Sequence, residues 1–279
     1  RFMDHWRPDL AVFTESELWP NLIEAAHRSG APLALVNARL NQKSLKSWSR
    51  WPSSARLLLS RFDWIGAADA RTAAGLSALG ARLVPALGNI KLETGLPDPD
   101  PAALDAAQAA TAGRPVFIAA STHAGEEAIL AEAHRHILEQ APDALMILAP
   151  RHPERASEAA RALEGAGLRF VRRSSGETPG AGTPVWLADT LGEMGLWFQI
   201  APAAVICGSF VDGIGGHNPV EATRAGAAVI TGPYTASFDE VYAAYDARGA
   251  RRLCRDAADT ADAVLAAWRG SGTSVAAAE

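Results

Sequence analysis

The sequence predicts an α/β fold made of two doubly wound domains with parallel sheets. Short apolar runs alternate with longer helical patterns from one end of the chain to the other, which is the pattern of strands joined by crossover helices. The runs are apolar throughout, as expected of strands that helices cover on both faces. Three closely spaced prolines, Pro97, Pro99 and Pro101, predict a linker between the two domains.

The first domain, residues 1–95, contains few predicted strands. Apolar runs predict strands at residues 10–14, 33–36 and 64–67, with a helix over 20–29, and residues 85–88 close the series. Because so few strands precede the linker, and because the chain begins with Arg1 rather than Met, we expect this domain to be truncated.

The second domain, residues 96–279, shows a clearer series. Doubly wound sheets bind ligands where a strand meets the following helix, so the residues after each strand are the candidate site. The predicted strands cover residues 116–120, 145–149, 169–172, 185–188, 204–207 and 227–230, and the two clearest helices cover 126–139 and 154–164.

The bulk composition excludes several classes of function. The chain has 279 residues and a net charge of −5, so we expect no nucleic-acid partner. The two cysteines, Cys207 and Cys254, fit no metal or disulfide spacing. No apolar run reaches transmembrane length. No Asp-x-Asp pair, a common metal motif, follows a predicted strand. We therefore predict no metal, and we expect no cofactor.

Two turns of the second domain are candidate phosphate sites. Thr190 and Glu193 have capping-box spacing, so a helix is predicted to begin there. The turn is either a cap only or a place where free N–H groups near Leu191 and Gly192 hold a phosphate.

The other turn follows the strand at 204–207. Asn218 suits an N-cap and Pro219 a first helical position. A well-capped helix would explain both residues. Three glycines beside His217, with Glu221 nearby, favour a phosphate cradle whose carboxylate binds ribose hydroxyls.

Three further strand ends carry polar residues. Arg151 either forms a surface ion pair or presents a fork of donors to a phosphate. Ser121 either caps a helix or holds a ligand, and the neighbouring His123 is more often structural in such a place. Glu15 and Glu17 after the first strand suit acid–base work or helix N-terminal charge equally well.

Seven strings in order give a family resemblance. ESELWPNL, VNARL, GN-I-K, ASTHAGEE, PRHPER, DTLGEMG and GSF…GGHNPVEA run from Glu15 to Ala222, and together they resemble the bacterial transferases of 3-deoxy-D-manno-octulosonic acid (Kdo). The resemblance implies a GT-B fold, in which two Rossmann-like domains face a cleft. It also implies inverting transfer of Kdo from CMP-Kdo to the lipid A precursor, lipid IVA, in lipopolysaccharide synthesis at the cytoplasmic face of the inner membrane.

The resemblance also implies residue roles. The N-terminal domain would be the acceptor side and the C-terminal domain the donor side, with Glu15 and Lys91 lining the cleft. The implied donor residues are Ser121, Arg151 for CMP, Leu191, Gly192 and Glu193 for phosphate, Gly216, His217 and Asn218 for phosphate or sugar, and Glu221 for ribose.

One departure from the family pattern affects activity. The family has an N-terminal membrane anchor and, soon after it, a motif with the glutamate proposed as general base, and neither is matched here. We therefore expect this chain alone not to transfer Kdo. Two alternatives stay open: another GT-B enzyme that uses a UDP-sugar, and a non-catalytic CMP-binding fragment.

A basic stretch between His27 and Asp63 contains no acidic residue. It is either a solvated helical face with its tryptophans, Trp48 and Trp51, turned into the core, or a surface for an anionic membrane and its lipid acceptor. We predict the second. Its expected contacts are Arg39 together with Lys43, Lys46 and Arg50, which helical spacing would place on one side.

Overall fold

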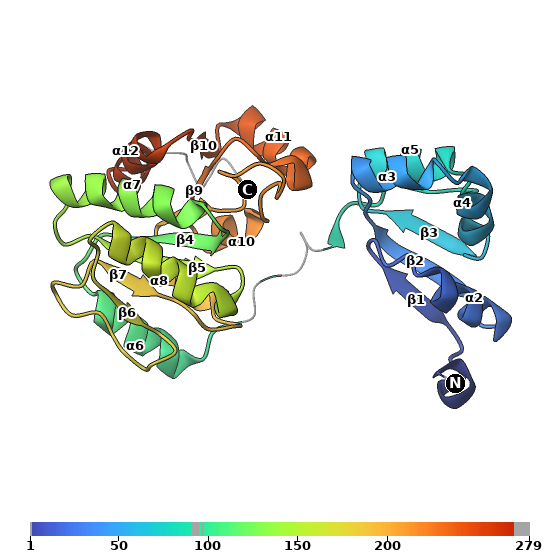
Figure 1. The fold of residues 1–279 in the computed structure, drawn as a ribbon, viewed down its shortest axis with the longest axis horizontal. Helices are drawn as coiled ribbons and strands as arrows, with labels where there is room; N and C mark the ends of the chain where they lie inside the picture. Colours follow the sequence, from blue (N-terminus) through green and yellow to red (C-terminus); the bar gives the residue numbers. More distant parts are fainter. Residues whose placement is uncertain (1, 91–94, 96–97, 271–279) are drawn as a thin grey trace. The chain divides into compact units, whose positions relative to one another are not determined.

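The computed structural model describes residues 2–90, 95 and 98–270, and it divides into two compact units, Arg1–Thr94 and Gly95–Glu279. Each unit has a parallel sheet with helices (Figure 1). The α/β class with parallel sheets that the sequence predicts is confirmed. Lys91 lies outside the described residues.

The N-terminal unit contains a three-stranded parallel sheet in the order β1-β2-β3. Residues 85–88 contribute only an isolated bridge from Ala86 to Ala67. The strands are β1 (Ala11–Thr14), β2 (Leu33–Ala38) and β3 (Trp64–Ala67), and the helices are α1 (Phe2–Trp6), α2 (Pro20–Arg28), α3 (Gln42–Trp48), α4 (Pro52–Leu59) and α5 (Ala70–Ala78).

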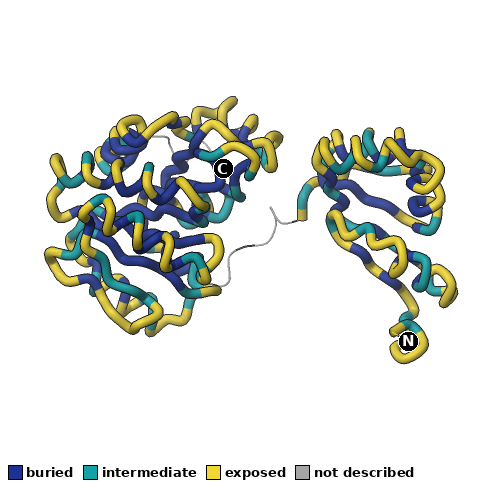
Figure 2. The backbone as a smooth tube through the Cα atoms, viewed as in Figure 1, coloured by how far each residue is buried: buried dark blue, intermediate teal, exposed yellow. Residues whose placement is uncertain are grey.

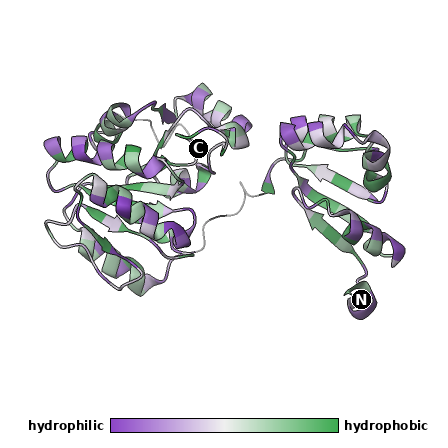
Figure 3. Ribbon diagram, in the orientation of Figure 1, coloured by the Kyte–Doolittle hydropathy of each residue, from purple (hydrophilic) through white to green (hydrophobic). Residues whose placement is uncertain are grey.

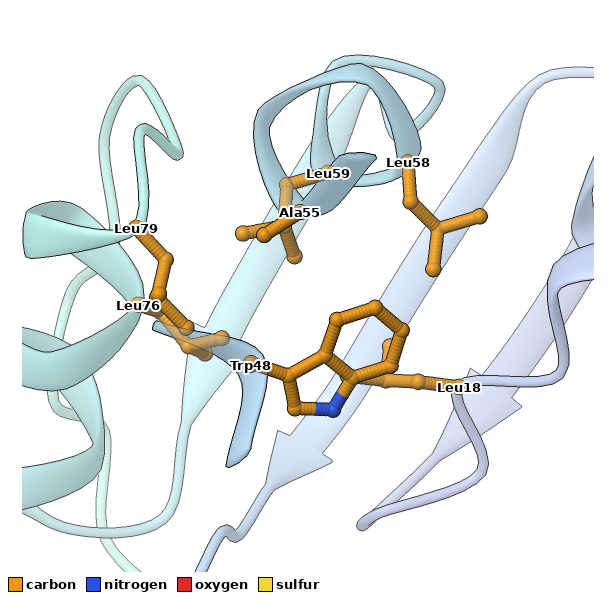
Figure 4. Close-up of a pocket in the computed structure, with 7 residues that line it drawn as sticks. All are labelled: Leu18, Trp48, Ala55, Leu58, Leu59, Leu76 and Leu79. Atoms are coloured by element: carbon orange, nitrogen blue, oxygen red, sulfur yellow. The ribbon is translucent and has the colours of Figure 1, made fainter. Parts of the chain in front are cut away.

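The core of this unit lies between the sheet and its helices. Ile23 of α2, Leu35 of β2 and Leu76 of α5 are fully buried. Figure 4 shows the Trp48 indole among apolar side chains of α4 and α5. Trp48 therefore packs against the core, as the simpler interpretation of the basic stretch expected, whereas Trp51 is 71% exposed.

The C-terminal unit has a seven-stranded sheet in the order β10-β9-β8-β4-β5-β7-β6, and every pair is parallel. The last strand, β10, was not predicted, because its three residues are polar or exposed. The strands are β4 (Val116–Thr122), β5 (Leu145–Pro150), β6 (Phe170–Arg172), β7 (Val185–Leu187), β8 (Ala203–Ile206), β9 (Ala228–Thr231) and β10 (Arg251–Leu253).

Helices cover both faces of this sheet, which explains why β5 and β8 are apolar at every position and β4 is apolar up to its last two residues (Figures 2 and 3). Neighbouring residues of β4 point to opposite faces, so Phe117 joins one core cluster and Ile118 the other. One cluster includes α7 (Glu126–Gln140), α8 (Ala156–Gly165) and α12 (Ala257–Trp268); the other includes α6 (Pro101–Thr111), α9 (Met194–Ile200), α10 (Val220–Arg224) and α11 (Asp239–Arg248).

The strand order reverses beside β4. The chain passes from β4 to β5 on one side of it and later returns to place β8 on the other side. In such sheets the crevice at the carboxyl ends of the strands, at the reversal, is where ligands bind. The loops that follow β4 and β8 are therefore the place to look for a site.

The predicted capping box at Thr190 is wrong. The helix α9 begins at Met194, and Glu193 occupies the N-cap without a side-chain cap hydrogen bond. Instead, the Thr190 hydroxyl donates to the Glu193 carboxylate, which also binds Arg173. An ion pair with an arginine competes better for the carboxylate than a backbone N–H does.

Candidate functional site

Two imidazoles meet at the reversal of the strand order. His123 follows β4 and His217 lies in the loop after β8, and their Nε2 atoms are 2.8 Å apart. The rings stack, with centroids 5.1 Å apart and planes 12° apart. The His152 ring, which follows β5, has its centroid 6.3 Å from that of His123. Three strand ends thus bring three imidazoles together.

The surroundings of this pair disfavour positive charge in the free protein. Burial, together with the charges of His123, Arg151 and His152, lowers the pKa of His217 to about 4. Burial also lowers the pKa of His123, against an opposing effect of Glu126. Both rings are therefore neutral near pH 7, while the nearby charge of Arg151 would favour an added anion.

The Gly-rich turn after β8 needs its glycines. Gly208 has φ +70°, and a Cβ atom there would lie 2.9 Å from Cδ2 of His217. Gly216 has φ +77°, and its N–H donates to the Gly208 carbonyl at 2.7 Å. Only residues without a side chain allow this close approach, so the turn sets the position of the His217 ring.

The next helix, α10, begins at Val220 with Pro219 at its N-cap, so the predicted N-cap at Asn218 is one position too early. The Asn218 side-chain oxygen accepts from the backbone N–H of Val220 at 3.1 Å, two positions on. Burial raises the pKa of Glu221, while the Asn218 hydrogen bond and the charge of Arg151 lower it. A half-buried carboxylate within the influence of the Arg151 charge is a suitable acceptor for ligand hydroxyls.

The carboxylates of Asp189 and Glu193 fix the turn after β7 through hydrogen bonds. Asp189 accepts from the N–H of Ser174 at 2.8 Å and from its hydroxyl at 2.7 Å. Glu193 accepts from Arg173 at 2.6 Å. Leu191 and Gly192 between them are exposed. The Glu193 side chain therefore has a partner within the protein, and a phosphate at this turn would have to use backbone N–H groups.

A backbone hydrogen bond and an ion pair join the segments that follow β4 and β5. Ser121, at the end of β4, has φ +60°. Arg151 follows β5 with its side chain exposed, and its backbone N–H donates to the Thr122 carbonyl at 3.0 Å. Arg155 binds the buried carboxylate of Glu127 at 3.0 Å, which fixes the loop that presents Arg151.

Sequence reasoning judged His123 to be structural and missed three further residues of this site: Glu126, Glu127 and Arg155. The sequence does place an acid pair, Glu126-Glu127, in the first turn of the helix after a buried strand. Acids in that position usually face solvent and favour the helix dipole. Their near-complete burial was the unexpected part.

The strand ends of the N-terminal unit also carry strained residues. Glu15 has φ +56°, and its carbonyl accepts from the N–H of Arg39 at 3.3 Å, so these two predicted residues are neighbours. Asn37 has φ +54° and is buried. Its amide donates to the Asn89 side chain and accepts from the N–H of Ile90, both at 3.2 Å, which fixes the segment that leads to Lys91.

The predicted basic side is only partly helical. Lys43 and Lys46 are exposed on α3, but α3 ends at Trp48. Arg50 is exposed beyond that end, so helical spacing does not place it beside the two lysines. Among the residues that the structure describes, no helix is long and apolar enough to cross a bilayer.

Comparisons with known proteins agree in both units. Residues 1–94 match the family model described as 3-deoxy-D-manno-octulosonic-acid transferase (kdotransferase). The chain is 38% identical to the transferase of that name from Bordetella pertussis, over 95% of this chain and 62% of the relative. It is 35% identical to that of Haemophilus influenzae, over 87% of this chain and 57% of the relative. The chain thus spans about 60% of these relatives.

Two solved structures are also similar. The C-terminal CMP-Kdo binding domain of WaaA from Acinetobacter baumannii is 30% identical, with a TM-score of 0.58, over 63% of this chain and 96% of that domain. The UDP-GlcNAc 2-epimerase from Neisseria meningitidis is 15% identical, with a TM-score of 0.62, over 96% of this chain and 70% of the epimerase. The second likeness concerns the fold alone.

Proposed function

The chain belongs to the 3-deoxy-D-manno-octulosonic acid transferase family, and from this premise we propose that its C-terminal unit binds CMP-Kdo as the donor of a Kdo transfer. The proposed acceptor is lipid IVA, bound by the N-terminal unit. The reaction would take place at the cytoplasmic face of the inner membrane in lipopolysaccharide synthesis.

One observation carries the proposal for the donor. His123 and His217, 2.8 Å apart, lie at the reversal of the strand order, with the charge of Arg151 acting on both. A nucleotide phosphate in this crevice would meet two N–H-bearing rings and a guanidinium, while Glu221 could accept from ribose hydroxyls. The WaaA domain that matches this unit is described as CMP-Kdo binding, which supports cytidine over uridine.

The proposed chemistry is a single displacement with inversion. A carboxylate takes the proton of the acceptor hydroxyl, whose oxygen attacks the anomeric carbon of Kdo. The bond from that carbon to the phosphate oxygen breaks, and CMP leaves with the electron pair. Arg151 and the N–H groups of the turn at Leu191 and Gly192 would stabilise the charge that develops on the leaving phosphate. Glu15 and Lys91 would line the acceptor side.

The proposed membrane contact uses the basic stretch of the N-terminal unit. Arg39, Lys43, Lys46 and Arg50 would face anionic lipid headgroups, each contributing about 1 kcal/mol. The exposed indole of Trp51, directly after Arg50, suits the interface between headgroups and acyl chains. Trp48 takes no part, because it packs against the core.

A calorimetric titration tests the donor assignment. The chain is titrated with CMP, UMP and UDP at fixed pH and salt. We expect CMP to bind most tightly. Tighter binding of UDP would favour an enzyme that uses a UDP-sugar, and the absence of any nucleotide binding would overturn the proposal. That this chain alone does not transfer Kdo stays a prediction, and a radiolabelled transfer assay with lipid IVA tests it.

A further inference from the structure

The side chain of Glu126 joins the loops that follow β4 and β8. Glu126 is the first residue of α7 and is fully buried. Its Oε2 atom accepts from the backbone N–H groups of His123 at 2.9 Å and Gly208 at 2.8 Å. Its Oε1 atom accepts from those of Ser209 at 3.0 Å and Phe210 at 2.9 Å. One carboxylate thus receives four backbone N–H groups.

These contacts exceed what a helix end requires. A buried carboxylate is tolerated only when hydrogen bonds replace its water, and an acid in the first turn often finds them locally. Here only the His123 donor is local. The other three donors are 82 to 84 positions away along the chain. The carboxylate therefore fixes the distance between two loops.

The positions of His123 and His217 depend on these hydrogen bonds to Glu126. A single oxygen of Glu126 holds the backbone of His123 and of Gly208. The Gly208 carbonyl in turn accepts from the N–H of Gly216, directly before His217. A displacement of Gly208 would therefore carry the His217 ring away from the His123 ring.

We propose that Glu126 is a positioning residue of the donor site, which sets the spacing of the His123–His217 pair for the phosphate of a bound nucleotide. This inference rests on the proposed function, because it assumes that the pair receives that phosphate. Glu126 itself does not touch the ligand. Glu126 would therefore affect the affinity that the phosphate contributes, and not the affinity that the base and ribose contribute.

The test is the substitution Glu126→Gln. The amide keeps the volume, but its NH2 group faces two of the four N–H donors and cannot accept from them. Affinity is measured by calorimetry for CMP and for cytidine, which lacks the phosphate. We expect CMP to bind about tenfold more weakly to the variant, as loss of buried hydrogen bonds implies, and cytidine affinity to be unchanged. Glu132→Gln, exposed on the same helix, is the matched control.

The outcomes separate the two proposals. If the wild-type chain binds no CMP, the proposed function fails. If it binds CMP and Glu126→Gln keeps the ratio of CMP to cytidine affinity, the positioning role is overturned. If Glu126→Gln does not fold, as circular dichroism would show, Gly208→Ala decides, since its Cβ would lie 2.9 Å from the His217 ring. An unchanged ratio there would also overturn the role.

Discussion

The Nε2 atoms of His123 and His217 lie 2.8 Å apart, although 94 positions of the chain separate the two residues. A hydrogen bond between two neutral imidazoles needs one donor and one acceptor nitrogen. A further proton makes one of the rings a cation, and a bound anion stabilises that charge. Protonation of the pair and binding of a phosphate are therefore linked, each favouring the other.

This linkage predicts that affinity for the donor phosphate rises as the pH falls. In the free protein, burial holds the pKa of His217 at about 4, and a bound phosphate raises it. Between the two pKa values binding takes up a proton, so affinity rises by up to about tenfold per pH unit lost. The probe is the methyl ester of CMP, whose phosphodiester keeps its charge, titrated by calorimetry between pH 7.5 and 5.5.

Two controls accompany that titration. The variant His217→Asn should flatten the dependence on pH, and cytidine should show none in either protein. An equal slope in the wild type and the variant would assign the proton to another group.

Glu221 is predicted to bind the ribose. Glu221→Ala should weaken CMP binding by roughly 1–3 kcal/mol, because ribose hydroxyls lose their acceptor. Calorimetry with 2′,3′-dideoxy-CMP isolates the contact, since this nucleotide should bind the wild type and the variant alike. Glu240→Ala, exposed in the first turn of α11, controls for the loss of a charge. Full CMP affinity in folded Glu221→Ala would exclude the ribose role.

Stability should fall in mild acid because of His134. Its ring is buried, its Nε2 lies 2.8 Å from the Pro184 carbonyl, and burial lowers its pKa to about 4. The unfolded chain binds a proton that the native state does not between pH 6.5 and 4, so the free energy of unfolding decreases as pH falls through that window, by about 3 kcal/mol in all.

Urea unfolding at pH 7.0, 6.0 and 5.0 measures this loss. His134→Gln should be less stable at pH 7 but show a smaller decrease towards pH 5. His136→Gln, on the same helix but only partly buried, should follow the wild type. The prediction fails if the decrease is the same in all three proteins.

The basic stretch is predicted to bind anionic membranes. Changing Lys43, Lys46 and Arg50 together to Gln should weaken binding to anionic vesicles by about 3 kcal/mol at low salt, since each cation contributes about 1 kcal/mol near such a surface. Co-sedimentation at low and moderate salt measures it. The matched control changes three exposed arginines of the C-terminal unit, Arg135, Arg161 and Arg252, to Gln. If both triple variants lost the same affinity for the vesicles, the binding would reflect net charge and not this surface.

The sequence allowed most strands to be predicted because they are short, apolar and bounded by turn residues. The strand β3 has the predicted bounds, and β4 extends the prediction by two residues. The strand β10 was missed because it has the sequence Arg-Arg-Leu and lies at the sheet edge, where burial leaves little pattern. Strand propensity is least informative for short edge strands, whose formation depends on tertiary packing.

The site was harder to predict because its key contacts join distant segments. Glycines marked the turns at Gly192 and Gly216 from local spacing alone, whereas both predicted caps were displaced. No local pattern shows that Glu126 reaches the loop after β8, or that Arg173 takes the Glu193 carboxylate from its expected cap. Such pairings depend on sheet topology, which spacing along the chain does not determine.

The position of β4 in the centre of its sheet also affects how the protein is made. A ribosome adds about 5 to 20 residues per second, so Glu126 and the β4 edge that will pair with β8 wait on the order of ten seconds for their partners. During that interval the apolar edge of β4 is open to pairing with other chains. Nascent chains stalled before β8 should therefore be the ones that depend most on chaperones.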